Sequence, residues 1–287
     1  MINPIIKREV QTSLRTWKLF FSIFLYVAML LLVTWIFLDM QLSQAVYGGF
    51  SPASVRYLYG ILAGVQMVFV YLAVPSLTAG SISGEREKQT LDILLTTKMR
   101  PFSIVFGKLA AGVGLVFLML LSALPVYAAL YYFGGIPIGY LLGATGFAIV
   151  SAIFVGAISV FFSCLYQRTM IAMLLTYLFC ALLLFGTAGG YLVYYIQVMN
   201  QATATMQAQP SHAVFYVLFA LNPGAGFAEI LVRLFQNMTL NQVFASGLSN
   251  GVMGNVPIWV VNVISELAAS VGLLSLAARR INPLRRR

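Results

Sequence analysis

Residues 138–165 read IGYLLGATGFAIVSAIFVGAISVFFSCL, and none of them carries a charge. A helix needs about 20 consecutive apolar residues to cross the hydrocarbon core of a bilayer, which is about 30 Å thick. This segment is long enough and apolar enough to cross. It therefore predicts that the chain is built from membrane-spanning helices.

The composition of the whole chain agrees with this interpretation. Of the 287 residues, 61% are hydrophobic and only 8% are charged. A soluble domain carries about 25% charged residues, because it must cover its core with polar groups. The composition excludes a soluble enzyme, a disordered chain and a disulfide scaffold. Cys164 and Cys180 lie in apolar runs without metal-type spacing, and we interpret them as small hydrophobic residues.

Five further apolar runs predict an all-α membrane protein with six transmembrane helices. The Gly and Pro residues at 134–137 form a turn between the third and fourth runs, and Pro125 is expected to kink the third. The predicted spans are residues 19–38, 57–78, 104–133, 138–165, 170–196 and 257–278, within a single transmembrane domain of residues 1–287.

Residues 1–18 alternate cationic and apolar side chains at helical spacing. This pattern predicts an amphipathic helix that lies on the inner membrane surface. A cleaved signal peptide is the alternative, with residues 43–45 as the cleavage site. The apolar run at 19–38 is longer than the 7–15 residues that are typical of a signal peptide. We therefore interpret it as an uncleaved anchor.

The distribution of positive charge predicts the orientation. With both termini cytoplasmic, all but two of the 17 Lys and Arg residues lie on the inner side, the exceptions being Arg56 and Arg233. The net charge of +10 then faces an anionic leaflet and gives no reason to expect a nucleic acid. The sequence predicts a multi-pass protein of a bacterial or archaeal plasma membrane.

The polar region before the last span, residues 197–256, is predicted to lie outside. Within it, residues 213–235 are apolar enough to suggest a seventh span. The sequence Asn-Pro-Gly at 222–224 interrupts this stretch, and Glu229 and Arg233 would be costly in lipid. We expect two short re-entrant outer helices instead, with Glu229 and Arg233 paired at i,i+4.

Motifs for catalysis are missing from the sequence. His212 is the only histidine, so a His-based triad or a zinc cluster in the membrane is excluded. Gly107-Lys108 is followed by Leu109, which does not fit an ATP-binding P-loop. We expect no enzyme activity, catalytic residue, bound metal or cofactor in this chain. Energy for any active work would come from a partner or an ion gradient.

The loop between the second and third spans predicts a cytoplasmic helix over residues 84–97. Ser83 can cap its start, Glu85 and Glu87 would lie in its first turn, and Pro101 would end it. An apolar ridge at i, i+3, i+4 consists of Leu91, Leu94 and Leu95. This ridge can lie on lipid or enter a groove on a cytoplasmic protein. The two acids weigh against lipid, because an anionic leaflet repels them.

The run ISGEREKQTLDILLTT at residues 82–97, followed by Gly-Lys-Leu at 107–109, resembles the permeases of ABC-2 type exporters. In that family a coupling helix between the second and third spans docks on an ATPase subunit. The resemblance extends to the N-terminal helix, the six spans and the outer segment, and it departs in the long outer region from Ile196 to Val256. It implies contact with the ATPase through Glu85, Arg86, Glu87, Thr90, Leu91, Leu94 and Leu95.

The resemblance implies the permease subunit of an ATP-binding cassette exporter. Its partners would be a cytoplasmic ATPase subunit, which holds ATP and Mg²⁺, and a second permease chain that is identical or related. Membrane lipid would surround the pair, and the substrate path would lie between the two permease domains. The sequence does not identify the substrate.

Two other functions stay open. One is a membrane-embedded transmitter that a partner ATPase moves without passage of a solute. The other is a secondary transporter, which should place several ionisable groups near mid-membrane. Glu266 is the only such acid, with Asn262 one turn earlier and Gln66 in the second span as the best polar candidate to face it. These three residues form the candidate intramembrane polar site.

Overall fold

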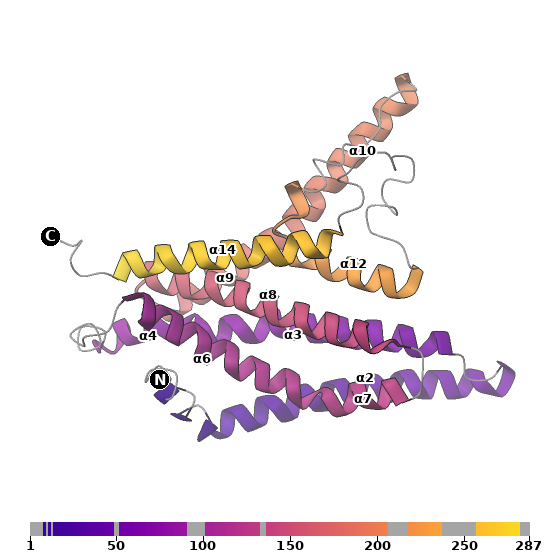
Figure 1. The fold of residues 1–287 in the computed structure, drawn as a ribbon, viewed down its shortest axis with the longest axis horizontal. Coiled ribbons are helices and arrows are strands. Elements are labelled where there is room, and N and C mark those ends of the chain that lie inside the picture. The colour runs from indigo at the N-terminus through magenta and orange to yellow at the C-terminus, as the bar shows by residue number, and fades with distance from the viewer. Residues whose placement is uncertain are drawn as a thin grey trace. The chain divides into compact units, whose positions relative to one another are not determined.

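The structure is a computed structural model that describes residues 8–9, 11–12, 14–48, 52–90, 101–132, 136–205, 217–236 and 257–281. In this part of the chain every regular element is a helix and none is a strand (Figure 1). The chain is therefore all-α, as predicted. Within these residues, six helical segments are long and apolar enough to cross a membrane: Leu19–Gln41, Ser54–Glu87, Pro101–Tyr132, Ile138–Leu165, Thr169–Val198 and Ile258–Ile281. They make it a multi-pass membrane protein.

The helices belong to two compact units. In chain order the α-helices are α2 (Trp17–Gly48), α3 (Pro52–Thr78), α4 (Gly80–Glu87), α6 (Pro101–Ser122), α7 (Leu124–Tyr132), α8 (Ile138–Leu165), α9 (Thr169–Ala181), α10 (Thr187–Thr205), α12 (Pro223–Gln236) and α14 (Ile258–Ile281), with a π-helix, η1, at Leu182–Gly186. The first unit comprises Met1–Tyr177 and Ser270–Arg287, and the second comprises Leu178–Ala269. The boundaries fall inside α9 and α14. A single domain over residues 1–287 stays a prediction.

The first unit is built on α8, against which α3, α4 and α6 pack (Figure 1). Glycine permits the close approach of α6, because a Cβ atom at Gly156 would lie 2.6 Å from Cδ1 of Leu109. The buried cluster comprises Ile82, Val105, Leu109, Ala157, Val160, Cys164, Leu274, Ala277, Ala278 and Ile281. Cys164 and Cys180 are both buried and free, in agreement with their interpretation as small hydrophobic residues.

Breaks in the α-helices divide three of the spans. The third span changes from α6 to α7 at Ala123, two residues before Pro125, and this confirms the predicted kink. The second span is broken at Ala79, between α3 and α4. The fifth contains the π-helix η1, which no proline marks and which the sequence analysis does not predict.

The structure differs from the predicted helix over residues 84–97. Helical residues run from Gly80 to Glu87 as α4, and the chain turns away at Lys88 and Gln89, the latter with a φ of 58°. The hydroxyl of Ser83 donates to the carbonyl of Ala79 at 2.9 Å, so Ser83 lies inside the helix and does not cap its start. The helical segment of the second span thus continues past the break at Ala79 and includes the acidic residues Glu85 and Glu87. Residues 91–97 lie outside the described part.

The second unit is formed by α10, α12 and the first half of α14. Tyr191 and Ile258 are buried there, with Phe219 and Val232 packed against them. The α12 helix begins at Pro223, as the Asn-Pro-Gly interruption predicts, and the predicted pair of Glu229 and Arg233 is confirmed, with 3.2 Å between Nε and Oε1. The position of α12 relative to the membrane, and the orientation of the termini, stay predictions.

We predict that Gly156→Val lowers the stability of the chain by about 1–3 kcal/mol, because the added side chain overpacks the contact with Leu109. Gly146→Val on the same helix is the matched control, since no atom lies within 4 Å of the position of its Cβ. Thermal unfolding in detergent measures the difference. Equal melting temperatures for the two variants would show that α6 and α8 do not pack closely at Gly156.

Candidate functional site

The start of α4 is held by a side chain of α8. The first backbone N–H groups of a helix have no partner within it, and Ala79 at the N-cap offers no side-chain acceptor. The hydroxyl oxygen of Ser163 accepts hydrogen bonds from the backbone N–H groups of Ile82 and Ser83, at 3.0 and 2.9 Å. Ser163 is fully buried and thus caps α4 from outside the helix.

The end of α4 is tied to the start of α9. The carboxylate of Glu87 accepts hydrogen bonds from the backbone N–H and the hydroxyl of Thr169, both at 2.8 Å. A carboxylate at a helix N-terminus satisfies a free N–H group and complements the helix dipole. A Cβ atom at Gly80 would lie 3.1 Å from Cγ2 of Thr169, so a small residue at this position of α4 allows the contact.

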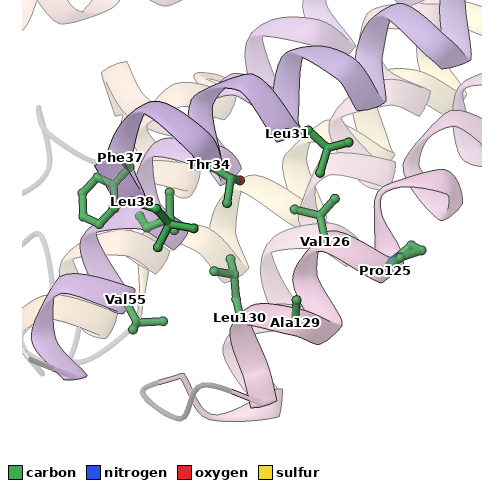
Figure 2. A pocket seen from close by; sticks show the side chains of 10 residues that line it. Leu31, Thr34, Phe37, Leu38, Val55, Pro125, Val126, Ala129 and Leu130 are labelled. Atoms are coloured by element: carbon green, nitrogen blue, oxygen red, sulfur yellow. The ribbon is translucent and has the colours of Figure 1, made fainter. Parts of the chain in front are cut away.

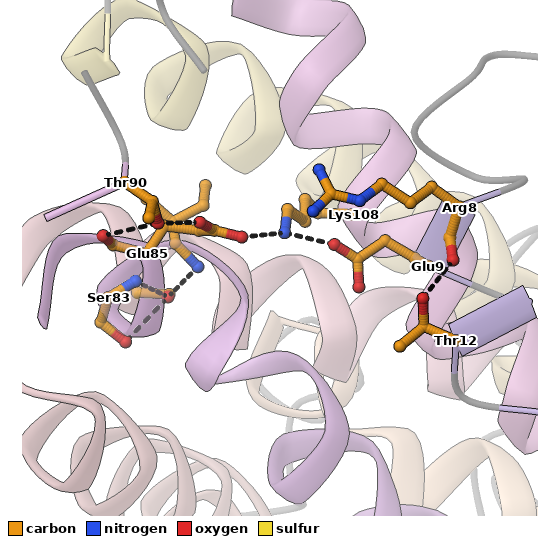
Figure 3. Close-up of polar contacts among 9 residues, drawn as sticks. Arg8, Glu9, Thr12, Ser83, Glu85, Thr90 and Lys108 are labelled. Atoms are coloured by element: carbon orange, nitrogen blue, oxygen red, sulfur yellow. Dashed lines mark hydrogen bonds and ion pairs between the residues drawn. The ribbon is translucent and has the colours of Figure 1, made fainter. Parts of the chain in front are cut away.

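A buried lysine connects α4 with α6 and with the N-terminal segment. Nζ of Lys108 lies 2.5 Å from Oε1 of Glu9 and 3.0 Å from Oε1 of Glu85 (Figure 3). The Lys108 side chain is 7% exposed, against 38% for Glu9 and 30% for Glu85. The other carboxylate oxygen of Glu85 accepts a hydrogen bond from the hydroxyl of Thr90. We call these four residues the Lys108 cluster.

A cavity of about 310 Å³ lies beside the Lys108 cluster. Its lining includes the charged side chains of Glu9, Glu85, Lys88 and Lys108 as well as apolar ones such as Leu77 and Leu115. The cavity leaves open space next to the two carboxylates, so small movements of these side chains do not require the core to be repacked.

The structure brings three of the predicted ATPase-contacting residues together around α4. Glu85 and Thr90 belong to the Lys108 cluster, and Glu87 binds Thr169. Arg86 is half-buried in the last turn of α4. The remaining predicted contacts, Leu91, Leu94 and Leu95, lie outside the described residues.

Sequence reasoning missed Glu9, and it used Lys108 as a cation of the inner face and as part of Gly-Lys-Leu at 107–109 without predicting a partner for it. The pair joins residues that are 99 positions apart, which no local spacing rule detects. One signal was present, because Lys108 lies in an apolar run between Phe106 and Leu109. A charge in such a position requires a counter-charge, and the acids predicted on the same membrane face are Glu9, Glu85, Glu87 and Asp92.

Polar side chains in the second unit hold the turn before α12. The amide nitrogen of Asn262 donates to the carbonyls of Phe219 and Ala220, at 2.7 and 2.8 Å. The hydroxyl of Ser265 also donates to Ala220. The amide of Asn222 donates to the carbonyl of Leu184 in η1 and to the hydroxyl of Thr187, at 3.2 and 2.6 Å. These contacts join the turn to α14 and to the π-helix.

Glu229 links α12 to the last span. Its carboxylate, 1% exposed, accepts hydrogen bonds from Nε of Arg233 and from the backbone N–H of Trp259, the latter at 2.8 Å. Trp259 is the second residue of α14, so the acid caps the start of that helix. The predicted ion pair therefore has a second role that the sequence analysis did not identify.

The candidate intramembrane site is divided between the two units. Glu266 and Asn262 are fully buried in the second unit, and the helical spacing places them one turn apart. Gln66, also buried, belongs to the first unit, where its side-chain oxygen accepts a hydrogen bond from the hydroxyl of Tyr127. The structure thus gives Gln66 a partner that the sequence analysis did not foresee. Its proximity to Glu266 stays a prediction.

A second cavity in the first unit, of about 230 Å³, has an apolar lining (Figure 2). It lies among Leu31 and Leu38 of α2, Val55 of α3, and Val126 and Leu130 of α7. Thr34 also lines it, but its hydroxyl donates to the carbonyl of Leu30 at 2.8 Å. The cavity offers no arrangement of polar groups for catalysis.

Among the described residues, no group of three or more His, Cys, Asp and Glu side chains could hold a metal ion. Comparison with protein families and with curated proteins finds no match for this chain. The functional assignment therefore depends on the residues and contacts of the chain itself.

We predict that Ser163→Ala lowers the stability by about 1–3 kcal/mol, because two buried N–H groups of α4 lose their acceptor. Ser159→Ala, one turn earlier on α8, is the matched control. Ser159 is also fully buried, and its hydroxyl has no hydrogen-bond partner among the described residues. Thermal unfolding of both variants in detergent tests this, and an equal loss would contradict the capping role of Ser163.

Proposed function

We propose that the chain is the permease subunit of an ATP-binding cassette exporter of ABC-2 type. It would form the substrate path and couple to a separate cytoplasmic ATPase through the segment at residues 84–97. The observation that carries the proposal is the set of contacts around α4. The residues that resemble the family, Glu85 and Glu87, bind α6 and α9 directly, so a force on the following loop would reach both spans.

The proposal gives the chain defined partners and a location. The cytoplasmic ATPase subunit would bind ATP and Mg²⁺, because the sequence of this chain has no motif for either. A second permease chain would complete the substrate path. The complex would lie in the plasma membrane of a bacterium or archaeon, with both termini of the permease in the cytoplasm.

The same contacts around α4 would serve a transmitter that moves with its ATPase and passes no solute. Purified complex in proteoliposomes separates the two functions. An exporter moves a solute across the bilayer when ATP is added on the ATPase side, whereas a transmitter hydrolyses ATP without such movement.

We predict that Leu94→Asp abolishes binding of the ATPase while the chain still inserts into the membrane. A carboxylate in an apolar docking groove would be buried without a partner, which lowers the affinity by about thirtyfold or more, on the order of 2 kcal/mol or more. Pull-down of tagged full-length chain from host membranes, followed by an ATP hydrolysis assay, measures this. Leu94→Met is the control and should retain the ATPase. Retention of the ATPase by Leu94→Asp would indicate that the ridge lies on lipid.

We predict that Glu266→Gln keeps expression and ATP-dependent transport, because glutamine preserves the shape and hydrogen bonding of this buried side chain. Glu266→Leu should lose stability, since it removes the polar group from a buried side chain that has an interaction partner. If the chain is a secondary transporter that uses the charge of Glu266, the glutamine variant should lose transport. Normal expression with no transport would assign the charge of Glu266 a direct part in substrate or ion movement.

A further inference from the structure

Lys108 has carboxylate partners from two different parts of the chain. Glu85 belongs to α4, and Glu9 belongs to the N-terminal segment, whose described residues 8, 9, 11, 12 and 14 are helical. Figure 3 shows the lysine between the two acids, with Glu9 on one side and Glu85 on the other. One ammonium group therefore connects two elements that are remote in sequence.

The three side chains differ in their access to water. Lys108 is 93% buried, whereas about a third of each carboxylate side chain is exposed. Both acids thus have access to water, whereas the lysine is almost fully shielded from it. A buried ammonium without a counter-charge is strongly unfavourable. Lys108 therefore needs at least one of the two carboxylates at all times, and loss of one strengthens its attraction for the other.

The two acids also differ in how firmly they are held. Glu85 receives a second hydrogen bond from Thr90, and its helix is fixed by Ser163 and by the bond of Glu87 to Thr169. Among the described residues near Glu9, the side chains of Arg8, Gln11, Thr12 and Leu14 are exposed. The contacts of Glu9 in the described part of the chain are with Lys108, whereas Glu85 is bound by both Lys108 and Thr90, so release of Glu9 breaks fewer of these contacts.

We propose that the N-terminal helical segment is a releasable arm, which Glu9 latches to Lys108 and whose release is controlled by Glu85. When Glu85 binds Lys108 fully, the lysine can give up Glu9, and when Glu85 is withdrawn, the lysine retains Glu9. Displacement of α4 or of the loop at Thr90 is thereby communicated to the N-terminal segment. The latch is a property of the chain alone. Its use in transmitting the motion of an ATPase rests on the proposed function.

The experiment measures the distance between the arm and α6 in the isolated full-length chain. Spin labels at Thr12 and Phe102, both exposed side chains of the first unit, report this distance in nanodiscs by double electron–electron resonance. The wild type should give one dominant, narrow distance. Glu9→Gln should add a second, broad population and raise the ratio of released to docked arm about tenfold, as expected for a partly buried ion pair.

Glu85→Gln tests the communication between the two acids. Because Lys108 then depends on Glu9, the released population should not rise above that of the wild type, in contrast to Glu9→Gln. Asp39→Asn is the control, since it removes an exposed carboxylate of α2, in the same unit but outside the Lys108 cluster. It should leave the distance distribution unchanged. A wild-type distribution in Glu9→Gln, or an increased release in Glu85→Gln, overturns the proposal.

Two further variants separate release of the arm from general unfolding. The double variant Glu9→Gln/Glu85→Gln leaves Lys108 buried without a counter-charge, so its melting temperature should fall by more than the sum of the single effects. Adding Lys108→Met, which keeps the apolar stem and removes the charge, should restore the melting temperature while the arm stays released. Additive single effects, or a docked arm in the Lys108→Met chain, overturn the latch. No ATPase is needed, so failure of the exporter assignment does not affect the outcome.

Discussion

Backbone groups that a helix break exposes in an apolar layer must find partners within the protein, because lipid offers none. In this chain a side chain from another element supplies such a partner at two of the breaks. Ser163 of α8 accepts hydrogen bonds from the N–H groups at the start of α4, and the side-chain amide of Asn222 donates a hydrogen bond to a carbonyl of the π-helix η1. The turn before α12 is held in the same way by Asn262 of α14. The hydrogen bonds at each break thus tie the broken helix to a second element of the chain.

The buried charges obey the same constraint. Lys108 is stabilised by Glu9 and Glu85, and Glu229 by Arg233 and by the start of α14. In both cases a charge that would be costly on one helix becomes a connection between two or three elements. The polar side chains of this membrane protein therefore join particular helices, in addition to the apolar packing around α8.

The sequence predicted well those features that depend on local physics. Apolar run length predicted six spans, Pro125 predicted the break between α6 and α7, and i,i+4 spacing predicted the pair of Glu229 and Arg233. It failed where a distant residue decides the outcome. Ser83 and the acids that follow resemble a helix start, yet they lie inside α4, which begins at Gly80 and whose first turn is capped by Ser163 from outside the segment. Glu9 was missed for the same reason, since its partner is remote in sequence.

The contacts of α4 also change how the resemblance to ABC-2 permeases is interpreted. Glu85 and Glu87 were expected to face an ATPase, but both accept bonds from within the chain. Their role in the proposed function is then to hold α4 against α6 and α9. Direct contact with a partner would fall to residues after Thr90, where the apolar ridge of Leu91, Leu94 and Leu95 follows in the sequence. In this arrangement the residues after Thr90 would attach the ATPase, and α4 would transmit its motion to α6 and α9. Docking would move the spans only if the connection between these two segments is rigid.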